Sequence, residues 1–496
     1  MIIHLRQNSC TILDRTGIKC SSYFQPFILF YRAFFMNNQV QLSEQQTALK
    51  ADQESVWHHL TNHSLYDNVA PMMIVEGKGM RVTDAHGREY LDATSGGLWT
   101  VNVGYGRESI AKAVYDQLLK MNFYSQAVAN VPAALFAEKL LEKMPGMGRV
   151  YYSSSGSEAN EKAYKIVRQI STKKHGGKKR KILFRERDYH GTTITTLSSA
   201  GQFERKNQYG PFTPGFVEFP HCLEYRSQWG NINDYGVKAA LEMERVILEE
   251  GADTIGAVIL EPITAGGGVI TPPEGYWQTI QAICKKYDIL IIIDEVVCGL
   301  GRTGKWFGYQ HYGIKPDIVT MAKGLASGYA AISCTVTTEE IFNIFKTESG
   351  DRDGYFRDVS TFGGCAAGPA AALENLRIIE SENLLENVTQ QGDYFKALLG
   401  ELKNKHPIIG DIRGKGLFVG LELVTDPVTK EPTHESLVMK IANHCLTVSG
   451  VMIGRTNRSF REFNNTITIS PALIATKADI DEIVNALDAA LTELTV

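Results

Sequence analysis

Three short segments of the sequence carry side chains whose types and order could do chemistry. Residues 153–160 (SSSGSEAN) lie between a predicted strand and a predicted helix, where small hydroxyl-bearing residues present backbone N–H groups to an anion. The same pattern fits an ordinary helix cap, because Ser followed by Glu is capping chemistry. Asp294 ends the most apolar predicted strand, and Lys323 follows the next one beside Gly324. A lysine at such a strand end can be desolvated and can then act as an amine nucleophile.

This order of a phosphate-binding turn, a carboxylate and a lysine is what pyridoxal 5′-phosphate requires. The turn holds the phosphate, the lysine forms a Schiff base, and the carboxylate keeps the pyridine nitrogen protonated so that the ring withdraws electrons. Tyr189 and His190 follow another predicted strand, and the tyrosine offers an aromatic ring for stacking on the cofactor. The segments together therefore indicate a pyridoxal-phosphate enzyme.

Other motifs in the chain lack the flanking residues or elements that their function would require. Residues 299–304 (GLGRTG) match a dinucleotide fingerprint, but no helical pattern follows them and the next acidic residue comes too early. Trp306 stands where a P-loop needs a hydroxyl group for Mg²⁺. His59 and His63 have a spacing that can bind zinc, but no Glu base lies between them. We therefore expect no metal site.

The composition excludes several classes of protein. The 496 residues include 51 Lys and Arg against 55 Asp and Glu, a net charge of −4, so we expect no nucleic-acid partner. The basic run at 173–181 (KKHGGKKRK) is interpreted as a solvated loop. Eight cysteines without a C-x-x-C pair favour reduced thiols in a cytoplasmic protein over a disulfide scaffold. No segment approaches the ~20 apolar residues of a membrane span, so we expect a soluble protein with no membrane partner.

The candidate residues must be positioned by alternating strands and helices. Apolar, β-branched runs without polar alternation predict strands covered on both faces, as in a parallel sheet. These runs lie at residues 149–152, 181–184, 255–260, 289–293 and 317–320, with helical patterns at 158–170, 235–250 and 276–286 between them. From residue 370 the pattern changes to long helices at 370–380 and 385–403 and a strand at 416–423. The fold class we predict is α/β, with a mostly parallel central sheet flanked by helices and a smaller α+β domain.

We expect four regions along the chain. Residues 1–35 form an N-terminal extension, 36–95 an N-terminal segment of the small domain, 96–365 the large cofactor-binding domain, and 366–496 the C-terminal small domain. The aromatic run that ends the extension fits neither a signal peptide nor a membrane span, because Pro26 and Arg32 interrupt it. We therefore favour Met36 as the start of the protein over an amphipathic targeting arm, which leaves residues 1–35 disordered or untranslated.

At these residues the chain resembles the class III aminotransferases of the fold-type I pyridoxal-phosphate superfamily. The matching segments run in the family's order at 155–159, 189–191, 260–262, 294–304, 323–324 and 361–364. Further segments resemble the taurine–pyruvate branch of that family, at 57–60, 92–106, 185–191, 209–215 and 220–225. The resemblance implies an aminotransferase that moves an amino group from taurine to pyruvate by a ping-pong mechanism, giving sulfoacetaldehyde and L-alanine. Transfer from β-alanine, diamines or simple amines is the alternative, and an aminomutase is a more distant one.

The resemblance also implies roles for individual residues. Lys323 would form the Schiff base and shuttle a proton, and Asp294 would pair with the pyridinium nitrogen. Tyr189 and Val296 would pack on opposite faces of the ring. The other cofactor-binding residues implied are Ser155, Gly156, Ser157, His190, Glu261 and Thr361.

Thr361 would reach the phosphate of a neighbouring subunit's cofactor, which implies a homodimer or tetramer with a shared active site. On the substrate side the resemblance implies Trp99 and Tyr124. A sulfonate or carboxylate substrate needs a guanidinium group, because a fork of N–H donors suits such anions. Three arginines lie near the family's position for it, and we favour Arg455 over Arg458 and Arg461, while all three could also be surface residues.

Overall fold

The computed structural model describes residues 44–227, 229–457 and 459–495, which fall into two units. In the first unit, residues 44–75 and 84–88 are described; they include a helix over 44–55 and the 3-10 helix η1 His63–Asp67. The second unit comprises residues 76–83 and 89 onward. The expected N-terminal extension, residues 1–35, lies outside the described residues. The expected domain boundaries at residues 36, 96 and 366 stay predictions.

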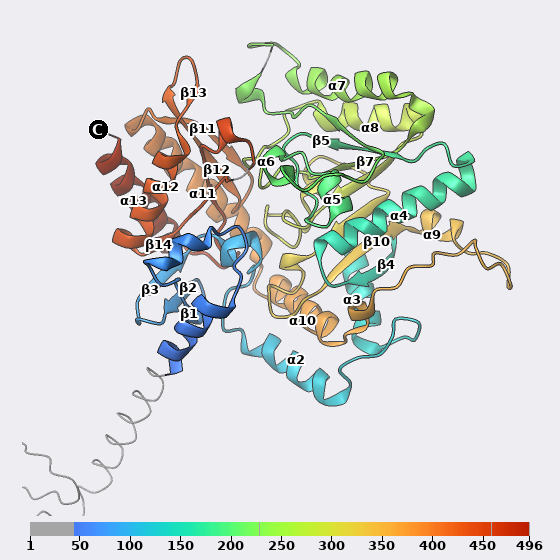
Figure 1. Cartoon of the computed structure of the whole chain (residues 1–496), viewed down its shortest axis with the longest axis horizontal. Helices are drawn as coiled ribbons and strands as arrows, with labels where there is room; N and C mark the ends of the chain where they lie inside the picture. Colours follow the sequence, from blue (N-terminus) through green and yellow to red (C-terminus); the bar gives the residue numbers. More distant parts are fainter. Residues whose placement is uncertain (1–43, 228, 458, 496) are drawn as a thin grey trace, which may run out of the picture. The chain divides into compact units, whose positions relative to one another are not determined.

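A seven-stranded sheet forms the centre of the second unit (Figure 1). In spatial order its strands are β4 Met147–Ser153, β10 Ser333–Thr338, β9 Ile318–Met321, β8 Leu290–Asp294, β7 Ile255–Leu260, β5 Lys181–Arg185 and β6 Phe216–Phe219. Strands β9, β8, β7, β5 and β6 run parallel to one another; apolar runs predict the first four, whereas β6 lies outside the predicted runs. The predicted α/β fold with a mostly parallel sheet is therefore confirmed.

Helices cover both faces of this sheet because alternate residues of each strand point to opposite sides. In β7, Ala257 and Ile259 join a core cluster with residues of α4 Gly156–His175. Val258 and Leu260 join the other cluster, with residues of α7 Tyr235–Glu250 and α8 Tyr276–Tyr287. The strands are thus buried on both faces, which holds their carboxyl ends rigidly in place.

Besides β6, the sequence pattern did not predict strand β10 of this sheet. It pairs antiparallel with both β9 and β4 and so inserts between two predicted strands. Its residues, SCTVTT, are rich in hydroxyls, which hides a buried strand from a search for apolar runs. The hydroxyl of Thr335 donates to the carbonyl of Ala159 in α4, which satisfies one of these polar groups.

The C-terminal part of the second unit forms its own sheet. The main path is β11 Ile409–Gly414, β12 Val419–Asp426, β16 Thr466–Ile469 and β15 Gly454–Arg455, with β13 Glu431–Pro432 paired to β12. Helices α11 Leu384–Lys405, α12 Glu435–His444 and α13 Lys477–Leu494 belong to this part. The strand predicted at 416–423 begins only at Val419, because Gly416 has a φ of +57° and turns the chain.

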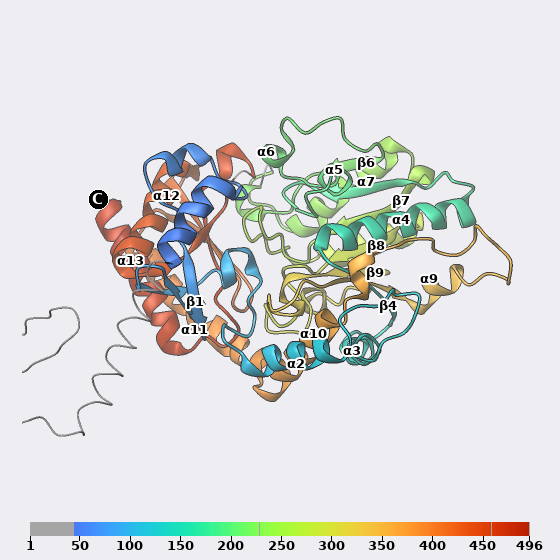
Figure 2. The same ribbon diagram turned by 60° about the horizontal axis from the view of Figure 1, so that its bottom comes forward.

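A smaller sheet has the order β1 Ile74–Lys78, β2 Arg81–Asp84, β3 Glu89–Asp92 and β14 Val451–Met452. Because β14 pairs in parallel with β3, segments that are far apart in the sequence share one sheet. Helices α2 Glu108–Lys120, α3 Val131–Glu142 and α10 Ala367–Ser381 pack together beside β4 (Figure 2). The remaining helices include α5 Ile194–Ser198, α6 Phe203–Lys206 and α9 Glu339–Ile344.

Neither a membrane-crossing helix nor a metal-binding cluster is found in the described parts of the chain. None of the described helices combines the length and the apolar character needed to cross a membrane. Within the same residues, no group of three or more His, Cys, Asp or Glu side chains could hold a metal ion. The six described cysteines are all free thiols, five of them buried: Cys222, Cys284, Cys298, Cys334 and Cys445, with Cys365 partly exposed.

Candidate active site

Lys323 lies two residues beyond β9, at the start of the 3-10 helix η6 Lys323–Leu325. Its backbone has a φ of +45°, a conformation that costs a non-glycine residue free energy and that occurs most often at functional sites. Its Nζ lies 5.1 Å from the centre of the Trp99 ring. Burial lowers the pKa of Lys323, so a larger share of this amine is neutral and nucleophilic than in an ordinary lysine.

Asp294 ends β8, next to the strand that leads to Lys323, and pairs in register with Thr320 of β9. One oxygen, Oδ2, lies 2.9 Å from both Nδ1 of His190 and Nδ2 of Asn160, while Oδ1 accepts from the backbone N–H of Val296. Asp294 is 3% exposed, so its carboxylate is shielded from water. Its contacts with the amide of Asn160, the imidazole of His190 and the backbone N–H of Val296 hold it in one orientation.

The amino end of α4 lies directly beside these residues. The side chain of Ser155 caps the helix by accepting from the backbone N–H of Glu158, so the helix-cap interpretation holds for that hydroxyl. A Cβ added to Gly156 would stand 3.1 Å from Val296, which shows how closely the helix approaches the residues after β8. The hydroxyl of Ser157 accepts from the backbone N–H of Thr192. The first turn of a helix offers backbone N–H groups to an anion, and this one is linked to Asp294 through Asn160.

Tyr189 is anchored by Glu261, which follows β7. Oε1 of Glu261 accepts from the backbone N–H of Tyr189, and Oε2 accepts from that of Ala265. Burial, with the nearby charges of Asp188 and Asp294, raises the pKa of Glu261 well above its ordinary value. Glu261 is thus a buried carboxyl group that fixes the backbone on which the Tyr189 ring is mounted.

Of the three further predicted site residues, Trp99 lies beside Lys323, whereas Tyr124 and Thr361 are exposed. The Trp99 ring faces Lys323 and packs edge-on against Phe418 at 6.1 Å. Tyr124 is 55% exposed, and its backbone N–H donates to Gly364, in the 3-10 helix η7 Thr361–Gly364. Thr361 itself is exposed. These last two residues therefore lie together at the surface of this subunit.

Arg455 lies on β15 and forms an ion pair with Glu435, the first residue of α12, with Nη1 2.6 Å from Oε1. Asn464 lies between Glu435 and Glu204: its Nδ2 donates to Glu204 at 2.7 Å and lies 3.5 Å from Glu435. Arg458 lies outside the described residues, as does the side chain of Arg461. Arg455 is thus a guanidinium group already engaged by a carboxylate.

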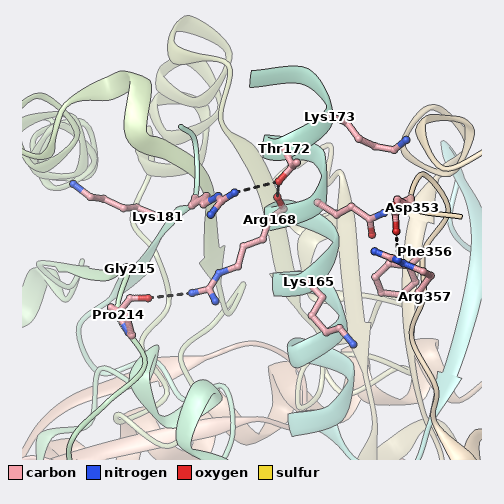
Figure 3. A pocket seen from close by; sticks show the side chains of 12 residues that line it. Lys165, Arg168, Thr172, Lys173, Lys181, Pro214, Gly215, Asp353, Phe356 and Arg357 are labelled. Atoms are coloured by element: carbon pink, nitrogen blue, oxygen red, sulfur yellow. Dashed lines mark hydrogen bonds and ion pairs between the residues drawn. The ribbon is translucent and has the colours of Figure 1, made fainter. Parts of the chain in front are cut away.

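A separate cavity of about 760 Å³ lies beside the second half of α4, and residues of the basic run at 173–181 line part of it (Figure 3). Arg168 donates to the carbonyl of Pro214, and Arg180 donates to the hydroxyl of Thr172. The basic residues that line it are Lys165, Arg168, Lys173, Arg180, Lys181 and Arg357. None of its lining residues belongs to the segments around Lys323, so its size does not mark the reactive site.

Two residues of this region were missed by the sequence reasoning. Asn160 donates to Asp294 and to the carbonyl of His190, and accepts from the hydroxyl of Thr320, so it links α4 to three separate segments of the chain. Its only signal in the sequence was its place at the end of the 153–160 segment. Glu435, the partner of Arg455, carried no signal, because the pair forms only when α12 and β15 come together.

Lysine and aspartate at the carboxyl ends of adjacent parallel strands, beside the amino end of a helix, define the architecture of a fold-type I pyridoxal-phosphate enzyme. Residues 63–491 match the family model for aminotransferase class III. The chain belongs to the class III aminotransferases, as the sequence motifs predict.

Relatives and solved structures agree with this assignment. The chain is 64% identical to hypotaurine/taurine–pyruvate aminotransferase of Paracoccus denitrificans, over 90% of this chain and 96% of that protein. It is 62% identical to taurine–pyruvate aminotransferase of Bilophila wadsworthia, over 89% and 96%. An aminotransferase structure from Bacillus anthracis superposes with a TM-score of 0.87 at 40% identity, covering 91% of this chain and 99% of that one.

The cofactor of this family is pyridoxal 5′-phosphate. A Pseudomonas jessenii omega transaminase solved in complex with PMP superposes with a TM-score of 0.84 at 34% identity, covering 90% of this chain and 98% of that one. The described residues fit such a group: Lys323 Nζ has no hydrogen bond or ion pair among them, and the buried Nε2 of His190 lacks a partner there too. Unpaired polar atoms beside a helix start are what a phosphorylated, aromatic cofactor would satisfy.

Proposed function

We propose that this protein transfers the amino group of taurine to pyruvate, giving sulfoacetaldehyde and L-alanine. The observation that carries the proposal is the 64% and 62% identity, over about nine-tenths of the chain, to relatives named for taurine and pyruvate. A relative named putrescine–pyruvate aminotransferase, from Pseudomonas aeruginosa, is 36% identical over 86% of the chain. The difference in identity favours taurine over a diamine as the donor.

In the proposed reaction the cofactor supplies an aldehyde that accepts the amino group and a ring that withdraws electrons from the reacting carbon. Lys323 binds the cofactor through Nζ, and the same Nζ removes the proton from the carbon that carries the donor amine. The lowered pKa of Lys323 suits both tasks, because each needs the neutral amine.

The remaining cofactor contacts are part of the proposal, and the positions of the side chains support them. Asp294 holds the proton of the ring nitrogen, with His190 and Asn160 fixing its orientation. The amino end of α4, with Ser155, Gly156 and Ser157, binds the phosphate. Tyr189, supported by Glu261, and Val296 bound the two faces of the ring.

Trp99 and Tyr124 are proposed to line the donor site, and Arg455 to bind an anionic end group of the substrates. The ion pair with Glu435 gives Arg455 a resting partner, from which a sulfonate or carboxylate must displace it. The pair therefore keeps a charged group satisfied when no anion is bound.

We also propose a homodimer with shared sites. The exposed apolar side chains near Tyr124 and Thr361 support it: Leu119 is 71% exposed, Val131 71%, Val359 87% and Phe362 68%. Large exposed apolar side chains are typical of a surface that a second subunit covers. A second copy of the chain would then carry Thr361 to the phosphate in its neighbour. The unpaired thiols support a reducing, cytoplasmic location.

A panel of amino donors tests the proposed function. The cofactor-loaded protein is given pyruvate with taurine, hypotaurine, β-alanine or putrescine, and alanine is measured. We expect the highest kcat/KM with taurine or hypotaurine. Turnover of β-alanine or putrescine without turnover of either sulfur-containing donor would overturn the choice of substrate and leave the aminotransferase family intact.

A further inference from the structure

The cavity beside the second half of α4 is bounded by three segments of the chain. One is α4 itself, from Lys165 to Lys173. In Figure 3 the start of β5 and residues 214–215 lie on one side of this helix, and residues 353–357 lie on the other. Its volume of about 760 Å³ is within the range of roughly 300–1,000 Å³ that is usual for pockets that hold small molecules.

Hydrogen bonds attach both sides of the cavity to the body of the fold. Nε2 of Gln169 in α4 donates to the carbonyl of Tyr355 at 2.9 Å, which ties the 353–357 segment to the helix. On the other side, the backbone N–H of Ile182 in β5 donates to the carbonyl of Gly215 at 2.8 Å. The cavity is therefore built from segments that are fixed to α4 and to the central sheet.

The lining of the cavity carries an excess of positive charge. Six of its twelve residues are basic, and one, Asp353, is acidic. Three of the basic residues form ion pairs with carboxylates: Lys165 with Asp358, Lys181 with Glu250, and Arg357 with Asp353. The other three, Arg168, Lys173 and Arg180, form no ion pair with any residue that the structure describes. No carboxylate within ion-pair distance thus balances these three charges.

The two arginines without a carboxylate are anchored over the same turn of α4. Nη2 of Arg168 donates to the carbonyl of Pro214 at 3.0 Å. Nη2 of Arg180 lies 3.4 Å from the hydroxyl of Thr172, which donates to the carbonyl of Arg168 one helical turn earlier. A Cβ on Gly215 would stand 3.8 Å from both Nη2 of Arg168 and the carbonyl oxygen of Arg180. Neutral oxygen atoms thus hold the two guanidinium groups close together.

This arrangement suits a ligand with several negative charges. A guanidinium group presents a planar fork of N–H donors, which binds phosphate through two hydrogen bonds, and a lysine adds a point charge. A ligand with one anionic group, such as taurine or pyruvate, could engage only part of the set. Two or more linked phosphate groups can engage Arg168, Arg180 and Lys173 together, and each contact then strengthens the others.

We propose that this cavity is a binding site, separate from the reactive lysine, for a small molecule that carries two or more adjacent phosphate groups. Arg168 and Arg180 bind the phosphate oxygens, and Lys173 supplies a third positive charge. None of the lining residues belongs to the segments around Lys323, so the proposal does not depend on which amine the enzyme uses. Inorganic polyphosphates and nucleoside polyphosphates share this chemistry, and the test distinguishes them.

Calorimetric titration of the cofactor-loaded protein at low ionic strength gives the first test. The probes are inorganic triphosphate, ATP without magnesium, adenosine and sulfate. We expect Kd values for triphosphate and ATP at least about tenfold below that for sulfate, because only the first two can engage several cations at once. A Kd for ATP well below that for triphosphate identifies a nucleotide as the ligand, and similar values identify the phosphate chain alone.

Several results of the titration would overturn the proposal. They are the absence of binding of both polyphosphates, sulfate binding as tightly as triphosphate, and adenosine binding as tightly as ATP. A single-stranded oligonucleotide that binds more tightly than either polyphosphate would also overturn it, since the ligand would then be a nucleic acid. Added salt should raise the Kd of triphosphate, because salt screens charges that are exposed to water.

A double variant tests the residues. Arg168→Gln combined with Arg180→Gln should raise the Kd of triphosphate by about 10- to 100-fold, as for the loss of charge-assisted hydrogen bonds. Both side chains are at least partly exposed, so the variant should unfold at the same denaturant concentration as the wild type. The matched control is Arg245→Gln combined with Lys286→Gln, which also removes two exposed cations, each paired with a glutamate.

The control should bind triphosphate like the wild type. An equal loss of affinity in both double variants would overturn the proposal, because net charge alone would then explain the binding. So would a wild-type Kd in the Arg168 and Arg180 variant. The visible absorption band of the lysine-bound cofactor should stay unchanged at saturating triphosphate. Loss of that band would show that the probe displaces the cofactor from its own site, which would equally contradict a separate site.

Discussion

Asn160 shows how one residue can organise several parts of the site. Its side chain contacts Asp294, the carbonyl of His190 and the hydroxyl of Thr320, which come from three separate segments. Asp294 and Lys323 could be predicted from the sequence because each follows a recognisable apolar strand. Asn160 could not, because its partners lie 30, 134 and 160 residues away and only the folded sheet brings them together.

Replacing Asn160 with alanine should weaken cofactor binding by about tenfold or more, because Asp294 loses a donor that orients it. The unpaired groups left behind should also lower the free energy of unfolding by about 1–3 kcal/mol. Titration with pyridoxal 5′-phosphate and denaturant unfolding measure the two effects. Ser171→Ala is the matched control, since this buried hydroxyl on α4 has no hydrogen-bond partner among the described residues. Wild-type cofactor affinity in Asn160→Ala would contradict this role.

At the scale of elements, the turn after β9 positions Lys323. Gly324 packs so tightly that a Cβ placed on it would stand 2.3 Å from Nδ2 of Asn102. Asn102 is itself fixed, since Nδ2 donates to the carbonyl of Leu300 and Oδ1 accepts from Arg302. The sequence indicated a glycine turn beside the lysine, but the reason that the position must be glycine is Asn102, which lies more than 200 positions away in the sequence.

Gly324→Ala should therefore displace η6 and cost about 1–3 kcal/mol of stability, as overpacking does. We expect a weaker visible absorption band from the lysine-bound cofactor, because Lys323 moves with the turn. Gly400→Ala is the control, since a Cβ at this position of α11 meets nothing within 4 Å. Loss of stability in both variants to the same extent would argue against a specific constraint at Gly324.

The C-terminal sheet contains a buried charge cluster. Glu422 of β12 forms ion pairs with Arg413 of β11 and with Arg226, all largely buried. Burial alone would raise the pKa of Glu422, but the charges and hydrogen bonds of the two arginines lower it below its ordinary value of 4.5. A carboxyl group with a lowered pKa stabilises the fold above pH 4.5, and this stabilisation is lost as the pH falls through the lowered value.

Glu422→Gln should leave Arg226 without its carboxylate and Arg413 with Asp411 alone, and should lower the free energy of unfolding by about 3 kcal/mol near neutral pH. The variant should also show a smaller fall in stability below pH 4.5 than the wild type, because the titrating group is gone. Denaturant unfolding at several pH values measures both. A deficit that is as large in strong acid as at neutral pH would contradict the linkage.

The strand order illustrates what a sequence pattern can and cannot predict. Five strands of the large sheet follow from apolar runs, because burial on both faces leaves no polar alternation. Strand β10 was missed because it is rich in hydroxyl-bearing residues, which contacts such as Thr335 with Ala159 satisfy, and the short strand β6 was not predicted either. The pairing of β3 with β14 was equally hidden, since it joins segments about 360 residues apart.

At the scale of the whole molecule, a single subunit leaves part of the proposed site at its surface. Tyr124 and Thr361 are exposed, and exposed apolar residues stand near them in the sequence at Phe123, Val359 and Phe362. The position of Thr361 in the sequence could be predicted only through the family resemblance. A solvent-exposed residue gains a function here only if a second subunit covers it.

Mixed dimers test this arrangement. Lys323→Ala and Thr361→Glu should each have little activity, the second because its carboxylate repels the phosphate. Subunits of the two variants, mixed under conditions that allow exchange, should regain up to about a quarter of the wild-type sites, since half of the sites in each mixed dimer are intact. Activity that never exceeds the sum of the two variants would contradict a shared site.

If Lys323 serves a transfer of nitrogen from taurine to pyruvate, the nitrogen atom of the donor must appear in alanine. The most direct measurement supplies the cofactor-loaded protein with pyruvate and taurine that carries isotope-labelled nitrogen, and follows the products by mass spectrometry. We predict labelled alanine and an equal amount of sulfoacetaldehyde, with neither product from Lys323→Ala. Alanine without the label, or no alanine from taurine while another amine is turned over, would contradict the account.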